Sequence, residues 1–227
     1  MKKVLAAALI CAASSFAAWD YFPVIEYGKG EAKLSVSQSR QGNYGGGDSD
    51  FKIRYSPVEN LELLSQIGYT FGARYQIIPV LSAGVDIGFP IPDTKWSFTP
   101  NVQFSTPITD ALVFGSNVQA TINTKDAYKN TDGIDLGAGV EFDLTMGKST
   151  VWVGCDIGMG LTESKDANGN KTKPKDDGRG LEIVPMLGYV AGVGNLSLGT
   201  NVGMAFGKDA GHDKFATFIG LDFSIKF

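Results

Sequence analysis

The sequence is poor in the side chains that most often carry catalysis or bind metals, since it has one histidine and two cysteines. Cys11 lies in the apolar N-terminal stretch, so removal of that stretch would leave Cys155 alone and exclude an internal disulfide. His212 lies in the polar stretch KDAGHDK, which has no serine to complete a nucleophilic pair. We therefore predict a protein that is not an enzyme, with no catalytic residue, no cofactor and no metal site.

The sequence also lacks an apolar run of the roughly 20 residues that a transmembrane helix needs. The N-terminal run follows Lys2 and Lys3 and ends near the small residues Ser15 and Ala17, which is the anatomy of a cleaved signal peptide. The net charge of −4 supplies no basic surface, so nucleic acid is not an expected partner. We therefore interpret residues 1–18 as a signal peptide and the protein as an exported one.

In place of helical periodicity, the chain alternates apolar and polar residues with a period of two, which is typical of strands with two unlike faces. The segment IDLGAGVEFDLTM is the clearest case. Its apolar face holds Leu136, Val140 and Phe142, whereas its other face holds Glu141 and small or acidic residues. The C-terminal segment FATFIGLDFSIKF repeats the pattern and ends on an aromatic residue.

Either a soluble β-sandwich or a membrane barrel could use this alternation. The alternating segments run about 9–13 residues, longer than the usual strand of about 5–6 residues and close to the 9–11 that cross a bilayer. The polar face is rich in glycine, serine and asparagine, and short connectors such as GKST and VGN alternate with long polar ones such as DANGNKTKPKDDGRG. These features favour an all-β, transmembrane, antiparallel up-and-down β-barrel.

We expect about twelve strands, with ten or fourteen as alternatives. Residues 19–30 would form a periplasmic N-terminal segment and residues 31–227 the barrel. The expected strands are 31–39, 50–56, 61–70, 73–78, 81–90, 95–105, 111–123, 133–146, 150–162, 181–192, 195–207 and 214–227. The hairpin within 61–78, with its turn at 70–72, is the least regular of these.

The C-terminal strand resembles the last strand of Gram-negative outer-membrane barrels, which alternates apolar residues and ends in an aromatic one. In those families this strand is the signal read by the barrel-assembly machinery, so the resemblance implies that Phe223, Ile225 and Phe227 have this role. The stretch 59–93 also resembles porin-like transporters. The resemblance implies a protein of the outer membrane of a Gram-negative-type bacterium, with membrane lipid and the assembly machinery as its partners.

If the polar face points inward, it brings charged side chains into the lumen. The candidate lumen-lining residues are Lys33, Lys52, Arg54, Arg74, Asp86, Asp135, Glu141, Asp143, Asp156, Glu182 and Asp222. Because the last strand closes beside the first, we expect Asp222 to approach Lys33. The first hypothesis is a porin-like channel for passive diffusion of small polar solutes. The alternatives are a non-conducting structural or adhesive barrel that binds partners through its outer loops, and an outer-membrane enzyme.

Aromatic residues near the predicted strand ends fit the girdles that barrels place at the two membrane interfaces. These residues are Tyr55, Tyr69, Phe71, Phe89, Trp96 and Phe227.

Overall fold

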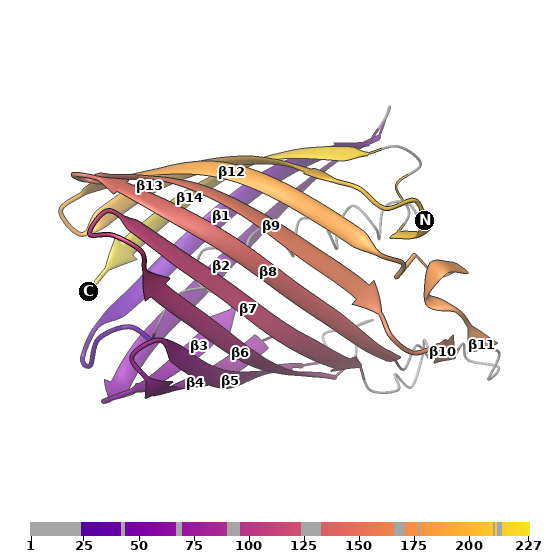
Figure 1. Cartoon of the computed structure of the whole chain (residues 1–227), viewed down its shortest axis with the longest axis horizontal. Helices are drawn as coiled ribbons and strands as arrows, with labels where there is room; N and C mark the ends of the chain where they lie inside the picture. Colours follow the sequence, from indigo (N-terminus) through magenta and orange to yellow (C-terminus); the bar gives the residue numbers. More distant parts are fainter. Residues whose placement is uncertain are drawn as a thin grey trace.

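A computed structural model of the chain describes residues 24–41, 44–66, 70–89, 96–123, 133–165, 171–176, 178–210, 212 and 215–227. Twelve strands of this part of the chain form one closed antiparallel barrel (Figure 1). They are β1 (Gly30–Gln41), β2 (Tyr44–Val58), β3 (Leu61–Gln66), β4 (Thr70–Ile78), β5 (Leu81–Gly88), β6 (Ser97–Pro107), β7 (Leu112–Asn123), β8 (Gly133–Met146), β9 (Ser149–Gly160), β12 (Glu182–Val193), β13 (Leu196–Ala205) and β14 (Ala216–Lys226). The fold class predicted from the sequence, with twelve strands, is confirmed.

Each barrel strand pairs with its neighbours in the chain, and β14 returns to pair with β1. The closing register runs from Glu31 opposite Lys226 to Arg40 opposite Thr217. Closure matters physically because it leaves no unpaired strand edge to meet hydrocarbon. No helix in the described residues is long and apolar enough to cross a membrane.

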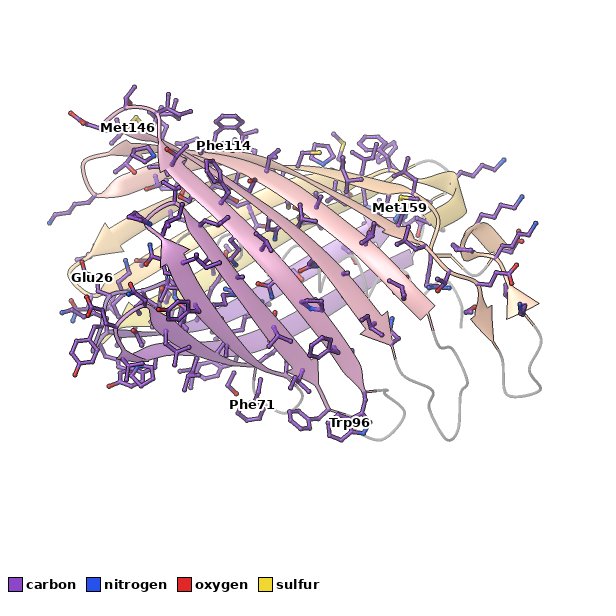
Figure 2. The ribbon with its side chains drawn as sticks, turned by 60° about the horizontal axis from the view of Figure 1, so that its bottom comes forward. Glu26, Phe71, Trp96, Phe114, Met146 and Met159 are labelled. Atoms are coloured by element: carbon purple, nitrogen blue, oxygen red, sulfur yellow. The ribbon has the colours of Figure 1, made fainter. Side chains whose placement is uncertain are left out.

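Two ends of the barrel differ in their connections. Short turns join β2 to β3, β4 to β5, β6 to β7, β8 to β9 and β12 to β13. They lie on the rim from which β1 starts and at which β14 ends, which we call the short-turn rim. Figure 2 places Glu26 and Met146 at this end and Trp96 at the other. The turns are tight: Gly147 and Gly194 have φ of 64° and 63°, a region that glycine enters without a steric penalty.

The opposite rim, which we call the long-loop rim, carries the longest connection, between β9 and β12. It contains the small hairpin of β10 (Ser164–Lys165) and β11 (Lys171–Thr172), followed by the 3₁₀ turn η1 (Pro174–Asp176). A second 3₁₀ turn, η2 (Lys208–Ala210), lies between β13 and β14. In Figure 1 the β10–β11 hairpin and the C-terminus lie at opposite ends of the molecule.

Two sequence-based boundaries were wrong. The expected loop at 40–49 is largely strand, because β1 and β2 stay paired as far as Gln41 opposite Tyr44. Serine, glutamine and glycine give no apolar alternation there, yet the backbone hydrogen bonds that make a strand do not depend on apolar side chains. In the second case β3 ends at Gln66 and β4 begins at Thr70, so the turn does not fall at 70–72. Phe71 instead continues the outward row of Ala73 and Tyr75.

The segment before β1 packs at the short-turn rim. The Gly28 amide donates to the Ser56 carbonyl at 2.9 Å, and the Ile25 amide donates to Glu62 Oε2 at 3.0 Å. Val24 is buried. The predicted signal peptide lies outside the described residues, and the division at residues 18 and 30 stays a prediction.

Candidate functional site in the barrel interior

The polar face of the strands is the inner face of the barrel. On β8, Leu136, Val140 and Phe142 are 36–39% exposed, whereas Glu141 is 0% exposed. On β1 and β14 the same contrast holds, with Lys33 and Ser224 buried and Leu34 and Phe223 exposed. A wall that exposes apolar rows and encloses charged ones suits a surrounding of hydrocarbon, as outer-membrane barrels have.

Four charged side chains from β1 to β4 form one network inside this wall. Arg54 donates from Nη2 to Glu31 Oε2 at 2.6 Å, and its Nη1 lies 3.6 Å from Glu62 Oε2. Arg74 Nη1 lies 3.6 Å from Glu62 Oε1. All four side chains are no more than 14% exposed, so each charge relies on its neighbours for compensation.

Two lysines on the same side also have acidic partners. Lys33 Nζ lies 3.4 Å from Asp222 Oδ1, which confirms the expected approach of the first and last strands. Asp222 also accepts from Ser35 Oγ at 2.6 Å. Lys52 Nζ lies 3.4 Å from Asp50 Oδ2. We call the charged residues Glu31, Lys33, Asp50, Lys52, Arg54, Glu62, Arg74 and Asp222 the paired wall.

Amide and hydroxyl side chains continue the inner surface beyond the paired wall. Asn101 Nδ2 donates to Asp86 Oδ2 at 3.1 Å, and Ser82 Oγ donates to Gln103 Oε1 at 3.0 Å. Asp86 is thus held by a neutral donor across the β5–β6 pair.

Two of the candidate lumen residues lie at the long-loop rim. The Asp135 carboxylate accepts hydrogen bonds from Arg179 Nη1 at 2.7 Å and from Asn123 Nδ2 at 2.9 Å. Glu182 Oε1 lies 2.7 Å from His212 Nε2, and His212 is buried. These contacts tie the β9–β12 and β13–β14 connections to the ends of the strands, so both carboxylates have local structural partners.

The remaining three candidates gather on β8 and β9. Asp156 lies opposite Gly139, and Glu141 opposite Gly154, so the acids alternate with glycines across the strand pair. Asp143 and Asp156 both lie near Glu141, and Asp143 shares a side-chain hydrogen bond with it. We call Glu141, Asp143 and Asp156 the acidic patch. Within the described residues, no group of three or more histidine, cysteine or acidic side chains has the arrangement of a metal site.

An apolar area adjoins the acidic patch on β9, β12, β13 and β14. Its buried residues are Trp152, Val184, Met186, Ala205, Ala216 and Phe218. The Trp152 ring lies over Gly188, and the Phe218 ring lies over Gly203, at distances that leave no room for a side chain on either glycine. The two glycines therefore let large rings lie flat on the inner surface.

Sequence reasoning missed two members of this interior. Asp50 has the same parity as Lys52 and Arg54 on β2, so the period of two contained the signal that places it inward. Arg179 lies in an irregular connection, where no periodicity could connect it with Asp135.

The outer wall carries exposed aromatic residues near both rims. Phe89 lies 5.6 Å from Phe71 and 5.0 Å from Trp96 between ring centroids, at the long-loop rim. Tyr55 and Phe227 are exposed at the short-turn rim. The sixth residue expected in the girdles, Tyr69, lies outside the described residues.

No family model and no curated protein matches the sequence. Among solved structures, the NanC porin superposes with a TM-score of 0.61 at 10% identity, covering 86% of this chain and all of the other. The translocator domain of the autotransporter NalP from Neisseria meningitidis gives 0.51 at 14% identity, covering 99% of this chain and 97% of the other. A bacterial polysaccharide outer-membrane secretin gives 0.51 at 9% identity, covering 87% of this chain and 98% of the other. The chain thus has the fold of outer-membrane β-barrels.

Proposed function

We propose that this protein is a porin-like channel of the outer membrane, which lets small polar solutes diffuse passively. The observation that carries the proposal is the inward face of the closed barrel, where Lys33, Arg74 and Glu141 are enclosed while the outer rows are apolar. Twelve strands also lie between eight-stranded barrels filled by side chains and 16–18-stranded porins with an aqueous channel. The similarity in fold to the NanC porin supports the same interpretation.

The proposal includes the route to the membrane. Residues 1–18 act as a cleaved signal peptide, and Phe223, Ile225 and Phe227 supply the strand signal for the assembly machinery. These three side chains are exposed on the outer wall at the rim where β14 ends, so a partner can reach them before insertion.

A second function, a non-conducting barrel that binds partners through its long loops, is favoured by a different observation. The rings of Trp152 and Phe218 and the ion pairs of the paired wall fill part of the interior. The third alternative, an enzyme, needs a nucleophile beside the histidine. His212 instead contacts Glu182 in the described residues.

Single-channel recording separates the first two functions. We expect purified, folded protein in a planar bilayer to give stable conductance steps. Folding is checked by the shift in gel mobility between heated and unheated samples. Folded protein that inserts and yields no steps contradicts the channel and supports the non-conducting barrel.

The candidate lumen residues are tested by ion selectivity. We expect neutral amides in place of Asp135, Glu141 and Asp143 to lower the preference for cations, measured as the reversal potential in a salt gradient. A matched Asp110→Asn variant changes an exposed carboxylate in the β6–β7 turn and should leave selectivity unaltered. Equal reversal potentials in all variants would remove these residues from the path.

A further inference from the structure

A groove of about 940 Å³ crosses the outer wall where β12, β13, β14 and β1 lie side by side (Figure 1). Its apolar side chains point away from the barrel interior, are each 42–51% exposed, and belong to Leu187, Val202, Met204 and Ile219. The inward-facing residues Met186, Gly203 and Phe218 also line it, so the groove reaches down to the sheet between the outward side chains.

The strand registers arrange the outward residues of the groove in two rows. The row deeper in the wall consists, on successive strands, of Leu187, Val202, Ile219 and Gln38. The row nearer the long-loop rim consists of Met204, Thr217, Arg40 and Gly45. Because threonine and glycine are small, the long Arg40 side chain stands between two short neighbours.

Arg40 gives the groove a positive charge at its end near the long-loop rim. It is exposed, and it lies opposite Thr217 where the pairing of β1 with β14 ends. Phe206 and Phe215 lie further toward the same rim, both exposed, with their ring centroids 6.3 Å apart. Exposed aromatic rings mark the depth of the lipid headgroups on outer-membrane barrels. Arg40 therefore lies just on the hydrocarbon side of that depth, from which a long side chain reaches the headgroups.

We propose that this groove binds an anionic lipid, with its phosphate headgroup against Arg40 and an acyl chain along Ile219, Val202 and Leu187. A guanidinium has five N–H donors and binds phosphate through two of them at once, so it can also keep a contact within the protein. The apolar row adds favourable contact with each methylene of the chain. The site lies on the outer wall, so it goes beyond the proposed channel and does not depend on whether the lumen conducts.

A lipid explains both parts of the site. A soluble anion would use Arg40 but gain nothing from the apolar row. A second copy of this chain could cover the apolar row, but it would have to bring an acidic group to Arg40. An anionic lipid has the charge and the chain in one molecule, and a wall that faces hydrocarbon is surrounded by lipid.

The headgroup contact is tested by native mass spectrometry of the folded protein in detergent, with phosphatidylglycerol and phosphatidylcholine of identical acyl chains as probes. We expect the parent to bind phosphatidylglycerol about fivefold more tightly, as expected for one arginine near anionic lipid. Arg40→Gln should lose this preference. The matched control Lys148→Gln removes an exposed cation from the β8–β9 turn at the short-turn rim and should keep it. Equal affinity for the two lipids in the parent, or an unchanged preference in Arg40→Gln, overturns the inference.

The groove is tested by filling it. Val202→Trp puts a large ring in the middle of the apolar row and should weaken phosphatidylglycerol binding about fourfold or more, the effect of losing contact with one methylene. Val118→Trp makes the same change on the outer wall of β7 and should stay within about twofold of the parent. Equal binding by the parent and both variants would remove the acyl chain from the groove.

A photoreactive phosphatidylglycerol locates the chain directly. With a diazirine in one acyl chain, it should label peptides of β12, β13 and β14 more strongly than peptides of β6 and β7. Even labelling around the wall contradicts a defined site. A dimer in the mass spectrum that Val202→Trp abolishes and lipid does not displace would assign the groove to a second copy of the chain instead.

These measurements separate the lipid site from the channel. Folding of each variant is checked by the shift in gel mobility between heated and unheated samples. Silence in bilayer recordings together with a retained preference for phosphatidylglycerol contradicts the proposed channel and supports the lipid site. Normal conductance of a parent that does not distinguish the two lipids contradicts the lipid site alone.

Discussion

Lys33 on the first strand and Asp222 on the last strand form an ion pair across the seam that closes the barrel, with Nζ 3.4 Å from Oδ1. Asp222 also accepts hydrogen bonds from Ser35 Oγ at 2.6 Å and Asn201 Nδ2 at 3.3 Å. It thus contacts side chains of β1 and of β13, the strands on either side of β14. The seam joins the first and last strands of the barrel, so Asp222 makes these contacts only when the barrel is closed.

Asp222→Asn should destabilise the barrel because it leaves the Lys33 ammonium enclosed without its counter-ion. We expect the free energy of unfolding to fall by about 3 kcal/mol, the lower end of the range for a buried pair that loses one partner. Urea unfolding in lipid vesicles, followed by tryptophan fluorescence, measures this change. The double variant Lys33→Met and Asp222→Leu should regain much of the loss, since it buries no unpaired charge. A double variant less stable than Asp222→Asn would contradict the argument.

The contact between Phe218 and Gly203 predicts a second effect. A Cβ at residue 203 would overlap the Phe218 ring and lie 2.9 Å from the Pro185 carbonyl oxygen. Gly203→Ala should therefore cost about 1–3 kcal/mol of unfolding free energy, as overpacking generally does. Gly158→Ala is the matched control, because its new methyl would meet nothing closer than the Leu136 carbonyl oxygen at 3.9 Å. Adding Phe218→Leu to Gly203→Ala should restore part of the loss, and equal stability of the two alanine variants would exclude the steric explanation.

The two faces of β7 predict opposite tolerance to charge. Val118, near the middle of the strand, is 59% exposed on the outer wall, and the adjacent Gln119 points inward. Val118→Arg should cost about 2–4 kcal/mol in a lipid bilayer, because it places a guanidinium near the midplane of the hydrocarbon. Gln119→Arg puts the same group on the polar face and should cost less. Unfolding in vesicles measures both, and a similar loss in the two variants would contradict a lipid-facing wall.

Sequence reasoning located the strands best where the two faces meet different surroundings. The strand at 133–146 matches β8 at both ends, because each apolar residue faces outward and each polar or small one faces inward. The alternation gives no signal at Gly45 to Gly47, where β2 runs on with exposed residues on both faces. Backbone pairing with β1 extends that strand, and pairing is a property of two segments together.

The sequence predicted which charged residues face the interior, but not most of the pairs that they form there. Parity alone placed Lys33, Arg54 and Arg74 on one face, and closure of the strands predicted the contact of Lys33 with Asp222. The sharing of Glu62 between Arg54 and Arg74 depends on the registers of β2, β3 and β4, which a pattern along one strand does not contain. The position of Glu141 between Gly115 and Gly154 likewise follows from the registers of β7, β8 and β9, which no single strand contains.

Glu62 also accepts a hydrogen bond from the Ile25 amide, and we expect this contact to hold the segment before β1 in place. Because the carboxylate is 1% exposed and accepts this hydrogen bond at 3.0 Å, the amide should exchange slowly with solvent. Glu62→Leu removes the acceptor and should accelerate exchange at Ile25 by about tenfold, the effect of losing one hydrogen bond to a charged group. Glu62→Gln keeps an acceptor oxygen and should have a smaller effect.

Hydrogen exchange read by NMR in detergent measures the Ile25 amide against an internal reference. The Gly28 amide donates to the Ser56 carbonyl and not to Glu62, so its protection should persist in both variants. Faster exchange at Gly28 as well as Ile25 would mean that the whole segment had detached, and the effect would then belong to the rim as a unit. Unchanged exchange at Ile25 in Glu62→Leu would show that the carboxylate does not hold the segment, because no other acceptor near that amide is altered by the substitution.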